Sequence, residues 1–287
     1  RALVQAGNLA PVDALAESLK SNGINPLPLF CASLKDPTSA DTIATLLEAS
    51  ATGLVLNATG FAISAPGAQR AATPFDGTHA PVLQVIFSGG NMEAWVDDMQ
   101  GLSARDIAMN VALPEVDGRI LSRAVSFKSQ AHFDEVTQCP IVSYVPVDDR
   151  IQFVAELARN WLTLRRLPPA QRRVAIVLAN YPNRDARLGN GVGLDTPAGT
   201  VELLRALKSQ GYGVEDIPSD GNALIDRIKA GPTNAATSGR HQPVRFSLDE
   251  YLTFFQSLDI RIRDEVNERW GTPESDPFFV GGMFALP

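Results

Sequence analysis

Two apolar segments, each short enough to be a strand, constrain the fold of this chain most strongly. Residues 53–58 (GLVLNA) and 81–87 (PVLQVIF) run almost without polar interruption, so both faces of each strand would be buried. Strands of this kind belong to parallel sheets that are covered by helices. The sequence therefore predicts an α/β fold, with parallel sheets flanked by helices in Rossmann- or flavodoxin-like units.

Two helix patterns precede the first of these segments. Pro11 marks the start of one helix and Gly23 its end, since proline favours the first helical position and glycine the position after the last. Asp36 is a suitable N-cap for the next helix, with Pro37 at its first position. Residues 26–32, between the two helices, are predicted as a further strand. Strands and helices thus alternate, as in a parallel sheet with right-handed crossovers.

The longest helix candidate covers residues 147–167. Acidic residues at its start and basic residues at its end complement the helix dipole, and two prolines follow it. Residues 173–179 (RVAIVLA) then predict a strand that opens another unit. We therefore divide the chain into a first α/β domain, residues 1–171, that ends with the long helix, and a second α/β unit, residues 172–287, that we expect to be incomplete.

Three features mark this second unit. A Gly-rich loop at residues 188–194 (LGNGVGL) follows the predicted strand. Thr196 is the predicted N-cap of the next helix, with Pro197 at its first position. Residues 277–286 are apolar, and we expect their partner strand to lie outside this sequence because the run is too apolar to stand exposed.

The charge balance narrows the range of partners. The net charge is -7 and the isoelectric point is about 5.0, which disfavours nucleic acid and anionic membrane surfaces because both attract basic patches. No apolar run approaches the roughly 20 residues that span a bilayer, and no signal peptide is visible. The two cysteines, Cys31 and Cys139, lie far apart, so we expect no disulfide and a cytoplasmic protein. Because the chain starts at Arg1 without Met, we expect an internal fragment of a larger protein.

Ligands of open α/β sheets bind beyond the carboxyl ends of the strands, which selects three loops here. They are residues 57–60, 88–91 and 180–193, all rich in Gly, Asn or Ser. The GNGVG sequence at residues 189–193 lacks the Lys and Ser/Thr of a P-loop, and it is not GxGxxG. Nucleotide binding is therefore the less favoured interpretation of this loop.

Other motifs are weaker. His79, His132 and His241 have no partner at metal-ligand spacing, so an ordinary hydrogen-bonded or exposed histidine is favoured for each. No G-x-S-x-G motif indicates a serine hydrolase. Residues 113–119 (LPEVDGR) place acidic and basic side chains around a glycine, which predicts either an ionic turn that orders a site loop or an ordinary solvated turn.

Three long stretches resemble a known family. From residue 173 the chain reads RVAIVLANYPNRDARLGNGVGLDTPAGTVELLRALKSQGY, and it opens with RALVQAGNLAPVDALAESLKSNGINPLPLFCASLKDP. Residues 110–129 read NVALPEVDGRILSRAVSFKS. Together these segments resemble the large-subunit family shared by cobaltochelatase and magnesium chelatase, with more similarity to its cobalt (CobN-type) branch. The resemblance runs along nearly all of the chain.

The resemblance implies part of the tetrapyrrole-binding subunit of an ATP-dependent enzyme of cobalamin biosynthesis. Such a metal-nitrogen ligase inserts Co2+ into the corrinoid precursor hydrogenobyrinic acid a,c-diamide, while AAA+ partner subunits of the CobS/CobT type hydrolyse ATP. The family's presumed catalytic segment, with HFG-x-HG, has no match here. We therefore assign no catalytic residue, leave the metal ligands unknown, and expect the isolated chain to be inactive.

The acid and amide groups of such a macrocycle suit Asn, Arg and backbone N–H donors. The candidate contacts lie in the strand-end loops and around the ionic turn. They are Asn57, Ser88, Glu115, Arg119, Asn180, Arg184, Arg187, Asn190 and Asp195.

Three alternatives stay open. The chain could be a structural and docking module for the AAA+ subunits, or part of a magnesium chelatase large subunit. A two-domain protein of the periplasmic ligand-binding type is a weaker alternative. A test of whether the chain binds tetrapyrrole distinguishes the docking module from the enzymatic interpretation.

Overall fold

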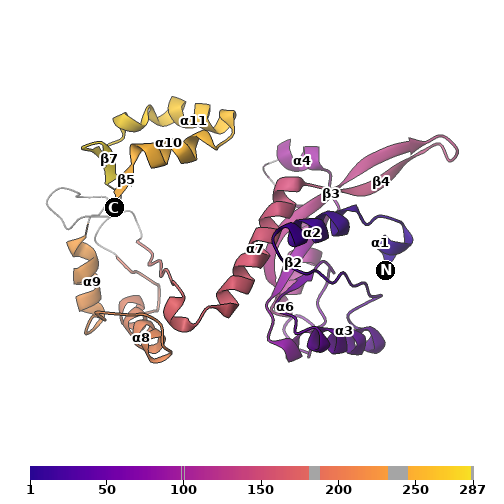
Figure 1. Ribbon diagram of the computed structural model, residues 1–287, viewed down its shortest axis with the longest axis horizontal. Helices are drawn as coiled ribbons and strands as arrows, with labels where there is room; N and C mark the ends of the chain where they lie inside the picture. The colour runs from indigo at the N-terminus through magenta and orange to yellow at the C-terminus, as the bar shows by residue number, and fades with distance from the viewer. Residues whose placement is uncertain (98, 100, 181–187, 232–244, 286–287) are drawn as a thin grey trace. The chain divides into compact units, whose positions relative to one another are not determined.

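The chain divides into two compact units at the end of its long helix. The computed structural model describes residues 1–97, 99, 101–180, 188–231 and 245–285 (Figure 1). The units are Arg1–Leu167 and Pro168–Pro287. The division lies four residues before the predicted end of the first domain at residue 171.

The first unit is built around one sheet. Its strands are β1 (Val55–Asn57), β2 (Val82–Ser88), β3 (Ile120–Asp134) and β4 (Cys139–Pro146). Its helices are α1 (Ala2–Gln5), α2 (Ala10–Ser21), α3 (Pro37–Ala49), α4 (Met92–Asp97), α5 (Ala104–Ile107), α6 (Leu113–Val116) and α7 (Asp148–Arg166), with a 3-10 turn η1 (Asp76–Thr78) and a π-helical segment η2 (Ala108–Ala112).

The strands lie in the order β1-β2-β3-β4. The pair β1–β2 is parallel, as predicted from the two apolar segments. The pair β2–β3 is also parallel, whereas β4 runs antiparallel to β3. The result is a mixed sheet rather than the all-parallel sheet expected. No α-helix lies between β1 and β2, so this connection is not the helical crossover of a Rossmann unit.

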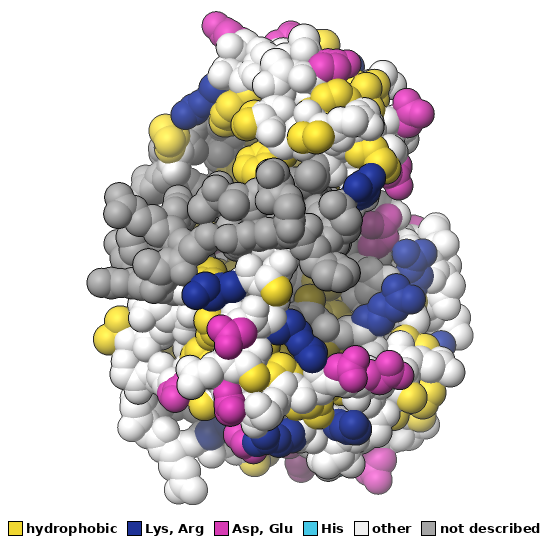
Figure 2. All heavy atoms as spheres, turned by 90° about the vertical axis from the view of Figure 1, so that its left-hand side faces the viewer, with side chains coloured by type: hydrophobic (Ala, Val, Ile, Leu, Met, Phe, Trp, Pro, Cys, Tyr) yellow, Lys and Arg dark blue, Asp and Glu magenta, His cyan; other side chains and the backbone are white. Residues whose placement is uncertain are grey.

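The second unit contains mainly helices in its described residues. These are α8 (Thr196–Ser209), α9 (Gly221–Ala230), α10 (Leu248–Gln256) and α11 (Ile260–Trp270), with 3-10 turns η3 (Pro169–Gln171) and η4 (Pro273–Ser275). A small antiparallel sheet has the order β5-β7-β6, with bounds β5 (Arg245–Ser247), β6 (Phe279–Val280) and β7 (Met283–Ala285). Figure 2 shows hydrophobic side chains on the surface of α10 and α11, where Phe254, Ile260, Ile262 and Trp270 are exposed.

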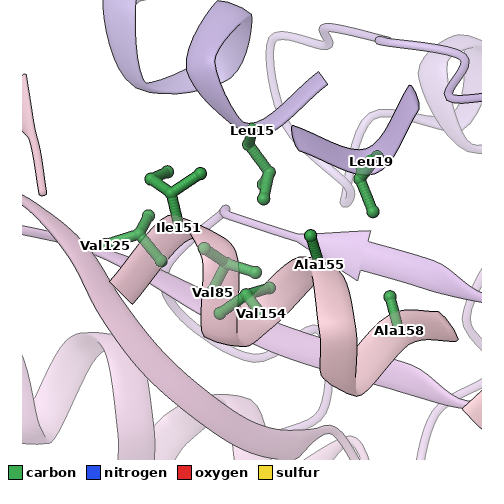
Figure 3. Close-up of a cluster of buried hydrophobic side chains, with 8 residues drawn as sticks. All are labelled: Leu15, Leu19, Val85, Val125, Ile151, Val154, Ala155 and Ala158. Atoms are coloured by element: carbon green, nitrogen blue, oxygen red, sulfur yellow. The ribbon is translucent and has the colours of Figure 1, made fainter. Parts of the chain in front are cut away.

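The main core of the first unit lies between the sheet and two helices. Leu15 and Leu19 of α2 point toward α7, where the small side chains of Ala155 and Ala158 let the two helices pack closely (Figure 3). Val85 of β2 contributes from the sheet, in a cluster with Val125, Ile151 and Val154.

The opposite face of the sheet is covered by shorter helices. Ile86, Ala124 and Phe127 form a second cluster there, against Met92 and Trp95 of α4. The ring centroids of Trp95 and Phe127 lie 5.3 Å apart. The two faces together explain why β2 is apolar on both sides.

The three predicted helices of the first unit are confirmed as α2, α3 and α7, and one predicted strand is wrong. Asp36 caps α3 by accepting the Ser39 N–H at 2.9 Å. Residues 26–32 form no strand, because Pro26 and Pro28 lack the N–H groups that a ladder needs. The large apolar side chains of this segment stay exposed, namely Leu27, Leu29 and Phe30.

The strand predicted at residues 173–179 is also absent. These residues are described but pair with no strand, and Val174 and Val177 are 54% and 91% exposed. A parallel strand buried on both faces needs neighbours on either side, and the sheet of this unit pairs other segments. The prediction that residues 173–179 open a parallel sheet is therefore wrong for this chain.

The apolar run at residues 277–286 has partners within the chain, contrary to expectation. β7 pairs with both β5 and β6, and Phe284 is buried. The centroid of its ring lies 5.2 Å from the ring centroid of Tyr251 and 5.1 Å from that of Phe279. Long-range pairing with β5 could not be recognised from the run itself.

Candidate functional site

A buried polar network lies where β1 and β2 meet the following loop. Asn57 ends β1, and its Nδ2 donates to Gln84 Oε1 at 2.7 Å and to the Thr59 carbonyl at 3.2 Å. Its Oδ1 accepts the Thr59 hydroxyl at 2.9 Å. Gln84 Nε2 donates to the same Thr59 carbonyl at 3.1 Å. The predicted candidate Asn57 is thus fully engaged in shaping the loop that begins at residue 58.

A buried ion pair extends this network. Arg119 and Asp117 lie 2.9 Å apart, and each side chain is 1% exposed. Arg119 Nη1 also donates to the Thr59 carbonyl at 3.2 Å, while Asp117 accepts the N–H groups of Ile63 at 2.7 Å and Ser64 at 3.0 Å. Of the two interpretations of residues 113–119, the ionic turn that orders a loop is confirmed. Glu115 from the same turn is exposed.

The Asp117 carboxylate stays ionised in this setting. Burial favours its neutral form, but the N–H donors of Ile63 and Ser64 and the charge of Arg119 outweigh burial and hold the pKa below its ordinary value of 3.8. A buried carboxylate that accepts these N–H groups holds the loop at Ile63 and Ser64 in place.

The loop after β2 is fastened in a similar way. Ser88 Oγ donates to Asp106 Oδ2 at 2.7 Å, and the Gly89 N–H donates to the same oxygen at 3.0 Å. The Gly90 N–H in turn donates to Ser88 Oγ at 3.2 Å. Asp106 is buried and was not recognised from the sequence, because only the fold brings α5 to the end of β2.

The candidates of the second unit lie around its Gly-rich loop. Asn180 and Leu188 form an isolated antiparallel bridge, and the Asn180 Oδ1 atom is buried without a partner among the described residues. Asn190 is exposed. Asp195, rather than the predicted Thr196, caps α8 by accepting the Ala198 N–H at 3.1 Å.

A side chain at Gly191 of the same loop would require Thr196 to shift. A Cβ atom at this position would lie 2.6 Å from the Thr196 hydroxyl. Two further candidates, Arg184 and Arg187, lie outside the described residues. The structure therefore brings Asn57 and Arg119 into one network, with Ser88 in a separate one and the remaining candidates elsewhere.

The loop at residues 59–66 forms one wall of a cleft of about 640 Å³ in the first unit. Residues 31–35 form the other wall, and Leu113 and Arg119 complete the lining. Its volume falls within the usual range of about 300–1,000 Å³ for small-molecule sites. The lining combines apolar groups with a few polar ones, namely Cys31, Ser33, Lys35, Thr59, Ser64 and Arg119.

Phe61 lies in this cleft in an unusual conformation. Its φ is +64°, a left-handed value that non-glycine residues rarely adopt, and the residue is 54% exposed. The Phe61 N–H donates to the Met109 carbonyl at 2.8 Å. Met109 belongs to the π-helical segment η2, a feature often found at functional sites. Sequence reasoning missed Phe61, since neither its conformation nor its contact with residue 109 is local.

Neither a metal site nor a membrane span is evident in the part of the chain that the structure describes. No group of three or more His, Cys, Asp or Glu side chains is placed there to hold a metal ion. No described helix is both long and apolar enough to cross a membrane. Of the three histidines, His79 precedes β2, His132 lies on β3, and His241 is outside the described residues.

Comparison with solved structures places the fold among the metal chelatases. The catalytic subunit of cobaltochelatase from Mycobacterium tuberculosis matches with a TM-score of 0.77 and 33% identity, over 99% of this chain and 24% of that one. Residues 1–285 match the CobN/Magnesium Chelatase family. The chain belongs to this family, as the sequence predicted.

Relatives in the family are much longer than this chain. The aerobic cobaltochelatase subunit CobN of a Sinorhizobium species is 56% identical over the whole chain, which spans 22% of that protein. The subunit of the same name from Pseudomonas aeruginosa is 46% identical, and the chain spans 23% of it. A magnesium-chelatase subunit of Cereibacter sphaeroides is 27% identical over 80% of this chain and 20% of that protein.

Proposed function

We propose that this chain is part of the tetrapyrrole-binding subunit of a cytoplasmic, ATP-dependent cobaltochelatase. The substrates are Co2+ and hydrogenobyrinic acid a,c-diamide, and AAA+ subunits of the CobS/CobT type hydrolyse the ATP. The observation that carries the proposal is the 56% and 46% identity, along the entire chain, to two proteins named aerobic cobaltochelatase subunit CobN.

The contribution we assign to this chain is to hold the ring. Metal insertion requires Co2+ to lose bound water and two pyrrole-type N–H protons to pass to a base. It also requires a macrocycle held in a productive orientation. The buried networks around Asn57, Asp117 and Arg119 make the loop at residues 59–64 rigid, which suits positioning.

The proposed contacts differ in how free they are to reach a ligand. Asn57 and Ser88 use their polar atoms within the fold, so they would act by shaping loops. Arg119 lines the cleft, and Glu115 and Asn190 are exposed. Asp195 caps α8, while Asn180 keeps an unpaired oxygen among the described residues. These roles, and those of Arg184 and Arg187, remain proposals.

Magnesium chelatase is the enzymatic alternative, and the lower identity of 27% to the Cereibacter sphaeroides protein makes it the weaker one. A docking role for the AAA+ subunits is the second alternative. The exposed apolar side chains of α10 and α11 are the observation that favours it, since such groups mark interaction surfaces (Figure 2).

A chimaera tests the proposal. This chain would replace the matching segment of the Sinorhizobium protein, and insertion of Co2+ into hydrogenobyrinic acid a,c-diamide would be followed by absorbance with the partner subunits and ATP. We expect insertion at a rate within about tenfold of the parent, because 56% identity preserves a shared site. The matched control takes its segment from the Cereibacter sphaeroides magnesium-chelatase protein and should be inactive. A soluble, folded chimaera that inserts no Co2+ would refute the proposal.

A further inference from the structure

The charged residues that line the cleft between residues 31–35 and the loop at residues 59–66 have the same sign. The chain as a whole carries a net charge of -7. The charged residues that line the cleft, Lys35 and Arg119, are nevertheless both basic. Because Asp117 pairs with Arg119, Lys35 carries the charge of this lining that is left for a ligand, and it favours an anionic group there.

Arg119 has hydrogen-bonding capacity left over. Its side chain is 1% exposed, and its Nε atom has no hydrogen-bond partner among the described residues. Most buried donors in native proteins are paired, so an unpaired one beside a cleft is notable. The charge of Arg119 is shared with Asp117, whereas Lys35 is exposed and forms no ion pair in the described part of the chain.

Phe61 adds a flat apolar surface to the cleft. A left-handed conformation is strained for a non-glycine residue and persists where the surroundings impose it. Here the Phe61 N–H is held by the Met109 carbonyl. The preceding Gly60 also lies against η2, since a Cβ there would be 3.0 Å from Asn110 Oδ1 and 3.2 Å from the Met109 carbonyl. The loop therefore keeps a large aromatic residue 54% exposed at the cleft instead of burying it.

We infer that this cleft binds a carboxylate-bearing edge of the tetrapyrrole, with Phe61 against the flat ring and Lys35 beside the carboxylate. Arg119 lies behind this carboxylate and holds the loop. The inference rests on the proposed function and deepens it, because it assigns the ring to a particular cleft and to two residues, Phe61 and Lys35. The cleft volume of about 640 Å³ suits one edge of a macrocycle and its side arms.

The test uses the active chimaera with Phe61→Ala and, separately, Lys35→Glu. Matched controls are Phe133→Ala in β3 and Lys208→Glu in α8, which change exposed residues outside the cleft. We expect each cleft variant to raise the KM for hydrogenobyrinic acid a,c-diamide about tenfold, since a lost ring contact or a reversed charge weakens ground-state binding. The KM for Co2+ should not change, and the controls should match the parent.

The outcomes separate the two proposals. An unmodified chimaera without Co2+ insertion would refute the proposed function itself. An active chimaera whose two cleft variants keep the parent KM for the tetrapyrrole would refute only the cleft assignment. Thermal unfolding of the 287-residue chain with each substitution checks the fold. If Phe61→Ala fails to fold, the KM of the Lys35→Glu variant alone tests the cleft assignment. This variant should fold, because the exposed Lys35 side chain contributes little to packing.

Discussion

Single residues of the first unit act mainly through one buried ion pair. Asp117 and Arg119 are joined at 2.9 Å, and together they secure Thr59, Ile63 and Ser64. A buried pair is weak evidence of stability in itself, but removal of one partner leaves an uncompensated charge. The pair therefore links the start of β3 to the cleft loop with little tolerance for substitution.

We predict that Asp117→Asn lowers the free energy of unfolding of the chain by about 3–5 kcal/mol at pH 7, as for other broken buried pairs. The pKa of Asp117 is lowered in the folded state, so its stabilising contribution is complete above the ordinary value of 3.8 and is lost as the pH falls through the folded pKa. Urea unfolding at pH 7 and pH 3 measures the free energy of unfolding of both proteins. The difference in this free energy between wild type and variant should be smaller at pH 3 than at pH 7. A difference in the free energy of unfolding below about 1 kcal/mol at pH 7 would contradict the prediction. The control is Asp41→Asn, on the exposed surface of α3.

At the scale of elements, close packing of α2 on α7 organises the main core. Ala155 and Ala158 of α7 are fully buried, and Leu15 and Leu19 of α2 lie over them (Figure 3). Small residues here set the distance between the helices, because protein interiors hold few voids. The helix α7 and its terminal charges were predicted from the sequence, whereas the helix that packs against it was not.

Ala158→Leu should destabilise the chain by about 1–3 kcal/mol, because three extra carbon atoms overpack this interface. Ala206→Leu makes the same change at an exposed position of α8 and should stay within about 0.5 kcal/mol of wild type. Equilibrium unfolding in urea compares the two variants. Equal stability of both would show that α2 and α7 are not tightly packed at residue 158.

At the scale of the molecule, the two units differ in how much core they contain. The three clusters of buried apolar residues that the structure defines, around Leu15, Leu34 and Ile86, all lie in Arg1–Leu167. The second unit buries fewer large apolar side chains among its described residues. Stability follows buried apolar area, so the first unit should be the more autonomous of the two.

Residues 1–167 expressed alone are therefore expected to unfold cooperatively, with slow amide exchange in β2 like that of the whole chain. Residues 168–287 alone should melt at a lower temperature. Circular dichroism and hydrogen exchange measure both. A first fragment without a cooperative transition would show that the two units depend on each other for folding.

The sequence by itself determined the local elements and the family. Caps such as Asp36, the charges of α7 and the apolar runs of β1 and β2 are short-range signals, so they could be read without a structure. The family resemblance came from long motifs, and it was confirmed.

Tertiary structure alone decided which segments meet. It showed that residues 26–32 and 173–179 join no described strand, that β4 runs antiparallel to β3, and that β7 pairs with β5 some 40 residues away. It also assembled the cleft, where Phe61, Met109 and Arg119 come together from distant positions. Strand pairing and buried polar contacts depend on partners far along the chain, and no local pattern of residues specifies them.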